Sequence, residues 1–174
     1  VKACREKNVP IRIGVNSGSV EKEILAKYGA PTPEAMVESA MYHASLLERF
    51  DFDDIVISIK SSNVENMIRS YETAAEKCSD PLHLGVTEAG TERMGLIKSG
   101  AGIGSLLMHG IGDTIRVSLT ADPVREVYAG LDILKALGIR TDGVQIVSCP
   151  TCGRTKIDLI RVANEVEEAL KDCR

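Results

Sequence analysis

Short apolar runs alternate with longer stretches of helical periodicity along this chain. Five runs rich in β-branched residues predict strands, and they lie at residues 11–15, 55–60, 82–86, 114–119 and 144–149. Strands that alternate with helices are typical of a parallel sheet whose strands are joined by right-handed crossovers. The pattern therefore predicts an α/β protein.

Capping signals mark where the intervening helices begin. Four helix starts are predicted in this way, two by proline after a capping residue and two by the spacing of a capping box: Thr32-Pro33, Asp122-Pro123, Ser62 with Glu65, and Thr155 with Asp158. Gly138 is expected to end the helix that begins after Asp122. A further helix is expected over residues 98–110, although its glycines lower the helical propensity.

One face of each of the first four strands is polar, because side chains alternate between the two faces of a strand. The residues on these polar faces are Arg12, Gly14 and Asn16, then Ser58 and Lys60, then His83, Gly85 and Thr87, then Arg116 and Ser118. An open sheet covered by helices on both sides would be apolar on both faces. The pattern therefore favours a (β/α)-barrel with a polar site at its C-terminal mouth over an open doubly wound sheet.

The number of strands falls short of a closed barrel. Four polar-faced strands are about half of the eight that such a barrel contains. We expect the chain to be a piece of a longer protein that supplies about the second half of the barrel. The alternative is a half-barrel that pairs with a second copy through its exposed strand edges.

Three of the predicted strands each have a cation on the inward face. Arg12, Lys60 and Arg116 would converge at the barrel mouth, where they suit a phosphate or diphosphate ligand. Asn16 and Ser118 could donate hydrogen bonds to the same ligand. The alternative is that each cation is paired with an acid inside the barrel lining.

The third strand ends in three residues with possible chemical roles. His83 shares the polar face with Thr87, and it is either a catalytic group or a core residue with its hydrogen bonds satisfied. Thr87 could donate to phosphate oxygens. Glu88 lies in the loop after the strand, where it could be an acid, a base or a charge at a helix N-terminus.

The segment after the predicted fifth strand holds two thiols. Cys149 and Cys152 are three positions apart, which is a spacing that binds one metal or cluster or forms a redox disulfide. A zinc ribbon needs a second such pair, and the chain lacks one. The remaining interpretation is an iron–sulfur cluster completed by ligands outside the chain.

Composition and charge exclude several classes of partner. The 174 residues carry a formal net charge of -4, which argues against a nucleic-acid partner. No apolar run is long enough to span a membrane, and the polar N-terminal residues do not resemble a signal peptide. Five cysteines are an odd number and do not form a disulfide framework, so we expect a reducing cytoplasm.

Three longer motifs and the cysteine segment resemble one known family. Residues 11–19, 82–90, 112–123 and 148–152 are similar to motifs of the hydroxymethylbutenyl diphosphate synthase family of the methylerythritol phosphate isoprenoid pathway. The resemblance implies an iron–sulfur oxidoreductase that opens 2-C-methyl-D-erythritol 2,4-cyclodiphosphate to 4-hydroxy-3-methylbut-2-enyl diphosphate. It implies the second half of a TIM barrel over residues 1–142 and the beginning of a small iron–sulfur reductase-like domain over residues 143–174.

The resemblance also implies roles for single residues. The six side chains that hold the diphosphate would be Arg12, Asn16, Lys60, Thr87, Arg116 and Ser118, with His83 and Glu88 as catalytic residues near the pocket. Cys149 and Cys152 would be two ligands of a [4Fe-4S] cluster, whose third cysteine and glutamate ligand lie outside this chain.

The resemblance implies partners as well. The complete protein would be a homodimer that receives electrons from flavodoxin or ferredoxin, and this chain alone would be inactive. Two other hypotheses remain beside it. One is a phosphate-binding barrel whose two thiols form a structural zinc knuckle, and the other is a non-catalytic half-barrel that dimerises.

Overall fold

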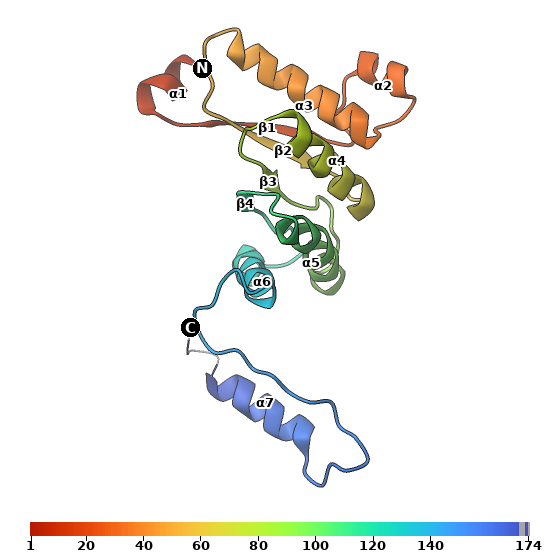
Figure 1. The fold of residues 1–174 in the computed structure, drawn as a ribbon, viewed down its shortest axis with the longest axis vertical. Helices are drawn as coiled ribbons and strands as arrows, with labels where there is room; N and C mark the ends of the chain where they lie inside the picture. Colours follow the sequence, from red (N-terminus) through yellow and green to blue (C-terminus); the bar gives the residue numbers. More distant parts are fainter. Residues whose placement is uncertain (171–172, 174) are drawn as a thin grey trace.

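Strands and helices alternate through the first three quarters of the chain (Figure 1). The computed structural model describes residues 1–170 and 173. The strands are β1 Ile11–Asn16, β2 Ile55–Lys60, β3 His83–Leu84 and β4 Thr114–Ile115. The helices are α1 Lys2–Lys7, α2 Lys22–Tyr28, α3 Pro33–Glu48, α4 Val64–Lys77, α5 Glu92–Met108, α6 Pro123–Ala136 and α7 Leu159–Leu170.

The described strands are parallel and follow one another in chain order. β1 pairs with β2 over six residues, and β3 pairs with β4 over two. A single parallel bridge between Ile57 and Leu82 connects the two pairs. The α/β class with parallel strands is therefore confirmed.

Two of the predicted strands are shorter than the sequence pattern indicated, and one is absent. β3 and β4 are regular over only two residues each, although the polar and apolar alternation continues beyond them. Residues 144–149 form no strand and are exposed, which corrects the prediction of a fifth strand there. A strand needs a neighbour for its backbone groups, and in the described residues this segment has none.

The two helix starts predicted from a capping residue followed by proline are confirmed. Thr32 accepts a hydrogen bond from the Ala35 amide at 3.2 Å, and Asp122 accepts one from the Val124 amide at 2.9 Å. Both helices have proline in the first turn, as predicted.

Both predicted capping boxes are wrong in position. Asn63, not Ser62, caps α4 by accepting from the Asn66 amide at 2.9 Å. Asp158, not Thr155, accepts from the Arg161 amide at 3.1 Å before α7. The helix expected over residues 98–110 begins earlier, at Glu92.

The core lies between the β1–β2 pair and the helices packed on it. Small residues let α3 approach the sheet closely, and Ala35, Ala40 and Ala44 are buried beside Ile57 and Ile59. In Figure 1, α3 and α4 lie along the same side of β1 and β2, and α5 and α6 continue the helical layer past β3 and β4. The polar residues of β1 and β2, among them Arg12, Ser58 and Lys60, alternate with the apolar residues along the strands.

The C-terminal part of the chain differs from the rest. Between residues 139 and 170, none of the described residues is buried. The apolar stripe of α7, which includes Val162 and Val166, is exposed. Figure 1 shows α7 apart from the other helices at the end of a long extended segment. Among the described helices, none is both long and apolar enough to cross a lipid bilayer.

Candidate anion site at the carboxyl ends of the strands

The strand register brings polar residues into rows across the sheet. Gly14 lies beside Ser58, and Asn16 lies beside Lys60, in the pairing of β1 with β2. Residues of parallel strands that pair in register point to the same face. Asn16 and Lys60 therefore lie side by side at the carboxyl ends of their strands.

The same rows continue onto β3 and β4. The bridge between Ile57 and Leu82 and the hydrogen bond from the Thr87 amide to the Ser61 carbonyl, at 3.3 Å, fit one pairing register between β2 and the segment that contains β3. In this register, His83 lies beside Ser58. His83 in turn pairs with Thr114 on β4.

Two of the predicted cations, Arg12 and Arg116, act on the third, Lys60. Lys60 is only 8 % exposed, and burial, together with repulsion from Arg116 and Arg12, lowers the pKa of its ammonium group. Like charges that lower the pKa of an ammonium group lie close to it. The structure thus brings Arg12, Lys60 and Arg116 into one cluster, which we call the cation cluster.

No acid neutralises the cation cluster within the described part of the chain. The ion pairs there join other residues, and none of them contains Arg12, Lys60 or Arg116. The alternative in which each cation is paired with an acid in the barrel lining therefore finds no support in the described residues. A nearly buried ammonium group without a counter-charge is costly, and an anionic ligand would remove that cost.

His83 lies within the field of the same cations. Burial and repulsion from Arg12, Lys60 and Arg116 lower its pKa to about 4, so the imidazole is neutral at pH 7. Its Nδ1 lies 2.7 Å from Thr114 Oγ1, and its Nε2 is buried without a hydrogen-bond partner in the described residues. One ring nitrogen therefore keeps an unused hydrogen-bonding site within the described residues.

The remaining predicted site residues lie around the cation cluster on loops and strand ends. Asn16 is exposed, whereas Thr87 and Ser118 are half-buried. Glu88 is exposed and has a backbone φ of 50°, in the left-handed region. Such a conformation is uncommon for a residue with a side chain and is often found at functional loops.

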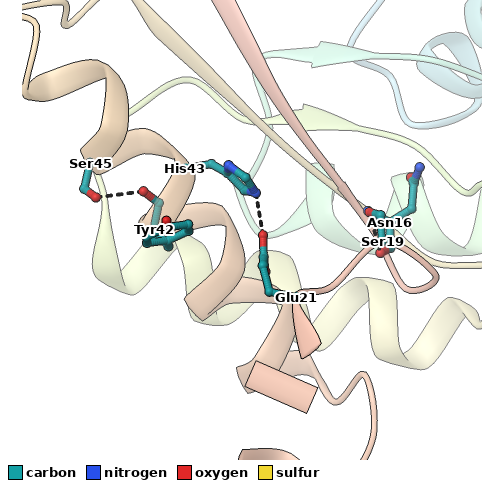
Figure 2. Close-up of polar contacts among 6 residues, drawn as sticks. All are labelled: Asn16, Ser19, Glu21, Tyr42, His43 and Ser45. Atoms are coloured by element: carbon teal, nitrogen blue, oxygen red, sulfur yellow. Dashed lines mark hydrogen bonds and ion pairs between the residues drawn. The ribbon is translucent and has the colours of Figure 1, made fainter. Parts of the chain in front are cut away.

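The loop after β1 is fixed by polar contacts that spacing in the sequence does not reveal (Figure 2). The Asn16 amide donates to Ser19 Oγ, which donates back to the Asn16 carbonyl, each at 3.0 Å. Farther along, Glu21 Oε1 lies 2.5 Å from His43 Nε2 on α3. Burial acts to raise the pKa of Glu21, but polar groups around it, His43 included, hold that pKa below its usual value. Figure 2 shows Glu21 and His43 pointing toward each other between the loop and α3.

Tyr71 on α4 is a second residue that sequence reasoning missed. Its ring is buried, and its hydroxyl contacts the backbone of both β2 and β3. The available signal was its hydroxyl group, because a buried tyrosine oxygen nearly always has a hydrogen-bond partner.

The two predicted cluster ligands lie far along the chain, in the exposed segment before α7. Cys149 and Cys152 are both exposed and reduced. The backbone N–H of Arg154, with the hydroxyl of Thr155, lowers the pKa of the Cys152 thiol. In residues 1–170 and 173, no three His, Cys, Asp or Glu side chains are grouped closely enough to hold a metal ion.

Comparison with known proteins identifies relatives of this chain. The sequence profile of the GcpE TIM-barrel domain matches residues 1–131. Proteins named 4-hydroxy-3-methylbut-2-en-1-yl diphosphate synthase (flavodoxin) are similar to it, among them one from Clostridium perfringens, with 65% identity over all of this chain and 50% of that protein. Those from Symbiobacterium thermophilum and Fusobacterium nucleatum are 61% and 60% identical over 98% of this chain, and over 46% and 48% of their own lengths.

These relatives agree with the family that the sequence motifs indicated. The chain spans about half the length of the curated relatives it matches. The matched profile covers β1 to β4 and most of α6, and it includes all three residues of the cation cluster. The chain belongs to the GcpE TIM-barrel domain family.

Proposed function

We propose that this chain is part of a 4-hydroxy-3-methylbut-2-en-1-yl diphosphate synthase. In the complete protein it would supply about the second half of a TIM barrel and the beginning of a small iron–sulfur domain. The observation that carries this proposal is the cation cluster beside a neutral His83, with Lys60 at the carboxyl end of β2. Ligands bind at the same end of the strands in TIM barrels.

The domain boundary is part of the same proposal. Residues 1–142 would form the barrel part and residues 143–174 the start of the cluster domain. A change in burial supports this division, because the last buried residue described is Ile133 on α6. The exposed apolar stripe of α7 needs a partner surface, which the rest of the cluster domain would provide.

The substrate would be 2-C-methyl-D-erythritol 2,4-cyclodiphosphate, which the complete enzyme opens reductively. Arg12, Lys60 and Arg116 would neutralise the two phosphates and fix their orientation, because guanidinium groups bind phosphate oxygens in a fixed geometry. Asn16, Thr87 and Ser118 would donate further hydrogen bonds from the rim. The three cations would also stabilise negative charge that develops on the diphosphate as its bond to carbon breaks.

His83 and Glu88 would be the catalytic residues. Because burial and the cations hold the pKa of His83 near 4, its imidazole stays neutral and can donate a hydrogen bond without adding charge. Glu88, on the exposed loop after β3, would exchange a proton with the substrate.

A [4Fe-4S] cluster is the cofactor that fits the two thiols. Thiolates are the usual ligands of such clusters, and the lowered pKa of Cys152 favours its thiolate form. Cys149 and Cys152 would be two of the ligands, and the others would come from outside this chain. The cofactor would supply electrons one at a time, delivered by flavodoxin or ferredoxin. A homodimer in the cytoplasm completes the proposal.

A matched pair of arginine variants tests the proposal in the complete protein. Arg116→Ala removes a member of the cation cluster, and Arg69→Ala removes an exposed arginine of α4 outside it. Loss of a charged hydrogen bond should lower kcat/KM for the cyclodiphosphate by about 10- to 100-fold in Arg116→Ala, and Arg69→Ala should match wild type. Wild-type turnover and affinity in Arg116→Ala would exclude the assignment of this site.

Metal analysis of the same preparations distinguishes the rival hypothesis. Anaerobically purified and reconstituted wild-type protein should contain iron and sulfide, and both should be lost in the variant Cys149→Ser. Zinc, together with no turnover, would instead favour a phosphate-binding barrel with a structural knuckle.

A further inference from the structure

A tyrosine hydroxyl interrupts the hydrogen-bond ladder between β2 and β3. On one side of the interruption, the Ile57 amide donates directly to the Pro81 carbonyl at 2.9 Å, and on the other side the Thr87 amide donates to the Ser61 carbonyl at 3.3 Å. In that register, the Ile59 amide should donate to the His83 carbonyl. It donates instead to Tyr71 Oη at 3.0 Å, and Tyr71 Oη donates to the His83 carbonyl oxygen at 2.5 Å.

The hydroxyl is held firmly in this position. Tyr71 is fully buried on the inner side of α4, in the turns that also bury Met67 and Ala74. Burial raises the pKa of its hydroxyl to about 12, so the proton that it donates to the His83 carbonyl stays in place. Only a group that accepts and donates at one atom can join an amide to a carbonyl in this way.

The bridge widens the sheet at the anion site. Two hydrogen bonds in series keep the Ile59 nitrogen farther from the His83 oxygen than one direct bond would. Lys60 follows Ile59 on β2, and the side chain of His83 projects into the field of the cation cluster. The bridged pair of backbone atoms therefore lies next to two of the groups proposed to meet the diphosphate.

We propose that Tyr71 is a positioning residue of the anion site, whose hydroxyl spaces β2 from β3 and thereby sets the gap between Lys60 and His83 that the diphosphate enters. This inference rests on the proposed function. Tyr71 itself does not touch the substrate in this arrangement, because it approaches the sheet from the helical layer. Without the hydroxyl, the strands either close to a direct bond or leave two backbone groups unpaired, and both outcomes displace Lys60 and His83.

The test compares two variants of the complete, cluster-loaded protein. Tyr71→Phe removes only the bridging hydroxyl, and Ala74→Gly weakens the same buried face of α4 while it leaves the bridge intact. Both should lower the melting temperature. We expect only Tyr71→Phe to raise KM for the cyclodiphosphate and Kd for inorganic pyrophosphate, by about tenfold or more. A misplacement of about 1 Å can cost an enzyme up to about a hundredfold in rate.

The outcomes separate this inference from the proposed function. Equal constants for Tyr71→Phe and Ala74→Gly, measured well below both melting temperatures, would show that Tyr71 only stabilises the fold. Wild-type protein that binds pyrophosphate without turning over the cyclodiphosphate would overturn the proposed reaction, and the pyrophosphate constants would still decide the role of Tyr71. Wild-type protein that binds neither would overturn both.

Discussion

Gly85 lies against the backbone of Arg116 so closely that a Cβ atom on residue 85 would be 2.9 Å from the Arg116 carbonyl oxygen. Real side chains almost never approach a backbone oxygen to this distance. The absence of a side chain at position 85 thus allows β3 and β4 to pair beside the cation cluster. In the register, Gly85 also lies beside Lys60, so the same position leaves room for the cations.

Gly85→Ala should destabilise the chain, because the added methyl group forces β3 away from β4. We expect a loss of about 1–3 kcal/mol in the free energy of unfolding, measured by urea denaturation. Gly100→Ala is the matched control, since a Cβ there meets nothing within 4 Å and lies on α5. The control should gain about 0.5–1 kcal/mol from its higher helix propensity. Equal effects of the two substitutions would contradict the close approach at Gly85.

Lys60→Met should stabilise the chain and weaken anion binding at the same time. The ammonium group is nearly buried among like charges, and in the described residues it has no acidic partner. An apolar side chain of similar length should therefore add about 1–2 kcal/mol to the free energy of unfolding.

Pyrophosphate provides the second half of the Lys60 prediction. A ligand that binds the folded state raises its melting temperature. Added pyrophosphate should do so for the wild-type chain and much less for Lys60→Met, as followed by differential scanning fluorimetry. A destabilised Lys60→Met with an unchanged pyrophosphate response would show that the lysine is neutralised by a group that the structure does not reveal.

His83 should make the free energy of unfolding depend on pH between about 4 and 6.5. Its pKa is about 4 in the folded chain and has the ordinary value of 6.5 after unfolding, so the unfolded state binds more protons in this window. The free energy of unfolding should therefore fall as the pH drops from about 6.5 to 4, by about 1–3 kcal/mol in total.

Two substitutions isolate the contribution of His83. His83→Asn should flatten this part of the pH profile, whereas His109→Asn, at an exposed position, should leave it unchanged. Urea denaturation at four or five pH values provides the measurement. The assignment fails if the wild type and His83→Asn have parallel profiles.

Asn63→Ala should cost more stability than Ser62→Ala. The Asn63 side chain accepts from the Asn66 amide at the start of α4, and loss of such a cap typically costs about 0.5–2 kcal/mol. Ser62→Ala should change the free energy of unfolding by less than about 0.5 kcal/mol. The reverse order would restore the capping box predicted from Ser62 and Glu65.

Alternation along the strands made much of the candidate site predictable. Along each strand, the polar residues alternate with apolar ones, and this pattern predicted that Arg12, Lys60 and Arg116 lie on the polar face. The structure brings these three side chains together. The same period could have added Thr114, which lies two positions before Arg116 and contacts His83. Local signals also located α3 and α6, because a capping residue and proline act within one turn.

Other features depend on contacts between distant segments, and no local pattern encodes them. The bridge through Tyr71 depends on where α4 packs, and the pair of Glu21 with His43 joins residues that share no periodic relation. Strand propensity alone suggested a strand at residues 144–149, but propensity does not create a neighbouring strand. Neighbouring polar residues also compete to cap a helix, which explains why Asn63 and Asp158 replaced the residues favoured by spacing.

Because α7 is exposed, its backbone amides should exchange hydrogen for deuterium by a different opening event from the amides of the core. A 12-residue helix without buried side chains opens and closes almost independently of the sheet, because isolated helices of this length are marginal in water. Deuterium should therefore replace its amide protons within seconds, whereas the amides of Ile57 and Val37 should wait for the whole core to open. Docking of any surface onto the apolar stripe of α7 would slow the exchange of the α7 amides and leave the exchange of the core amides unchanged.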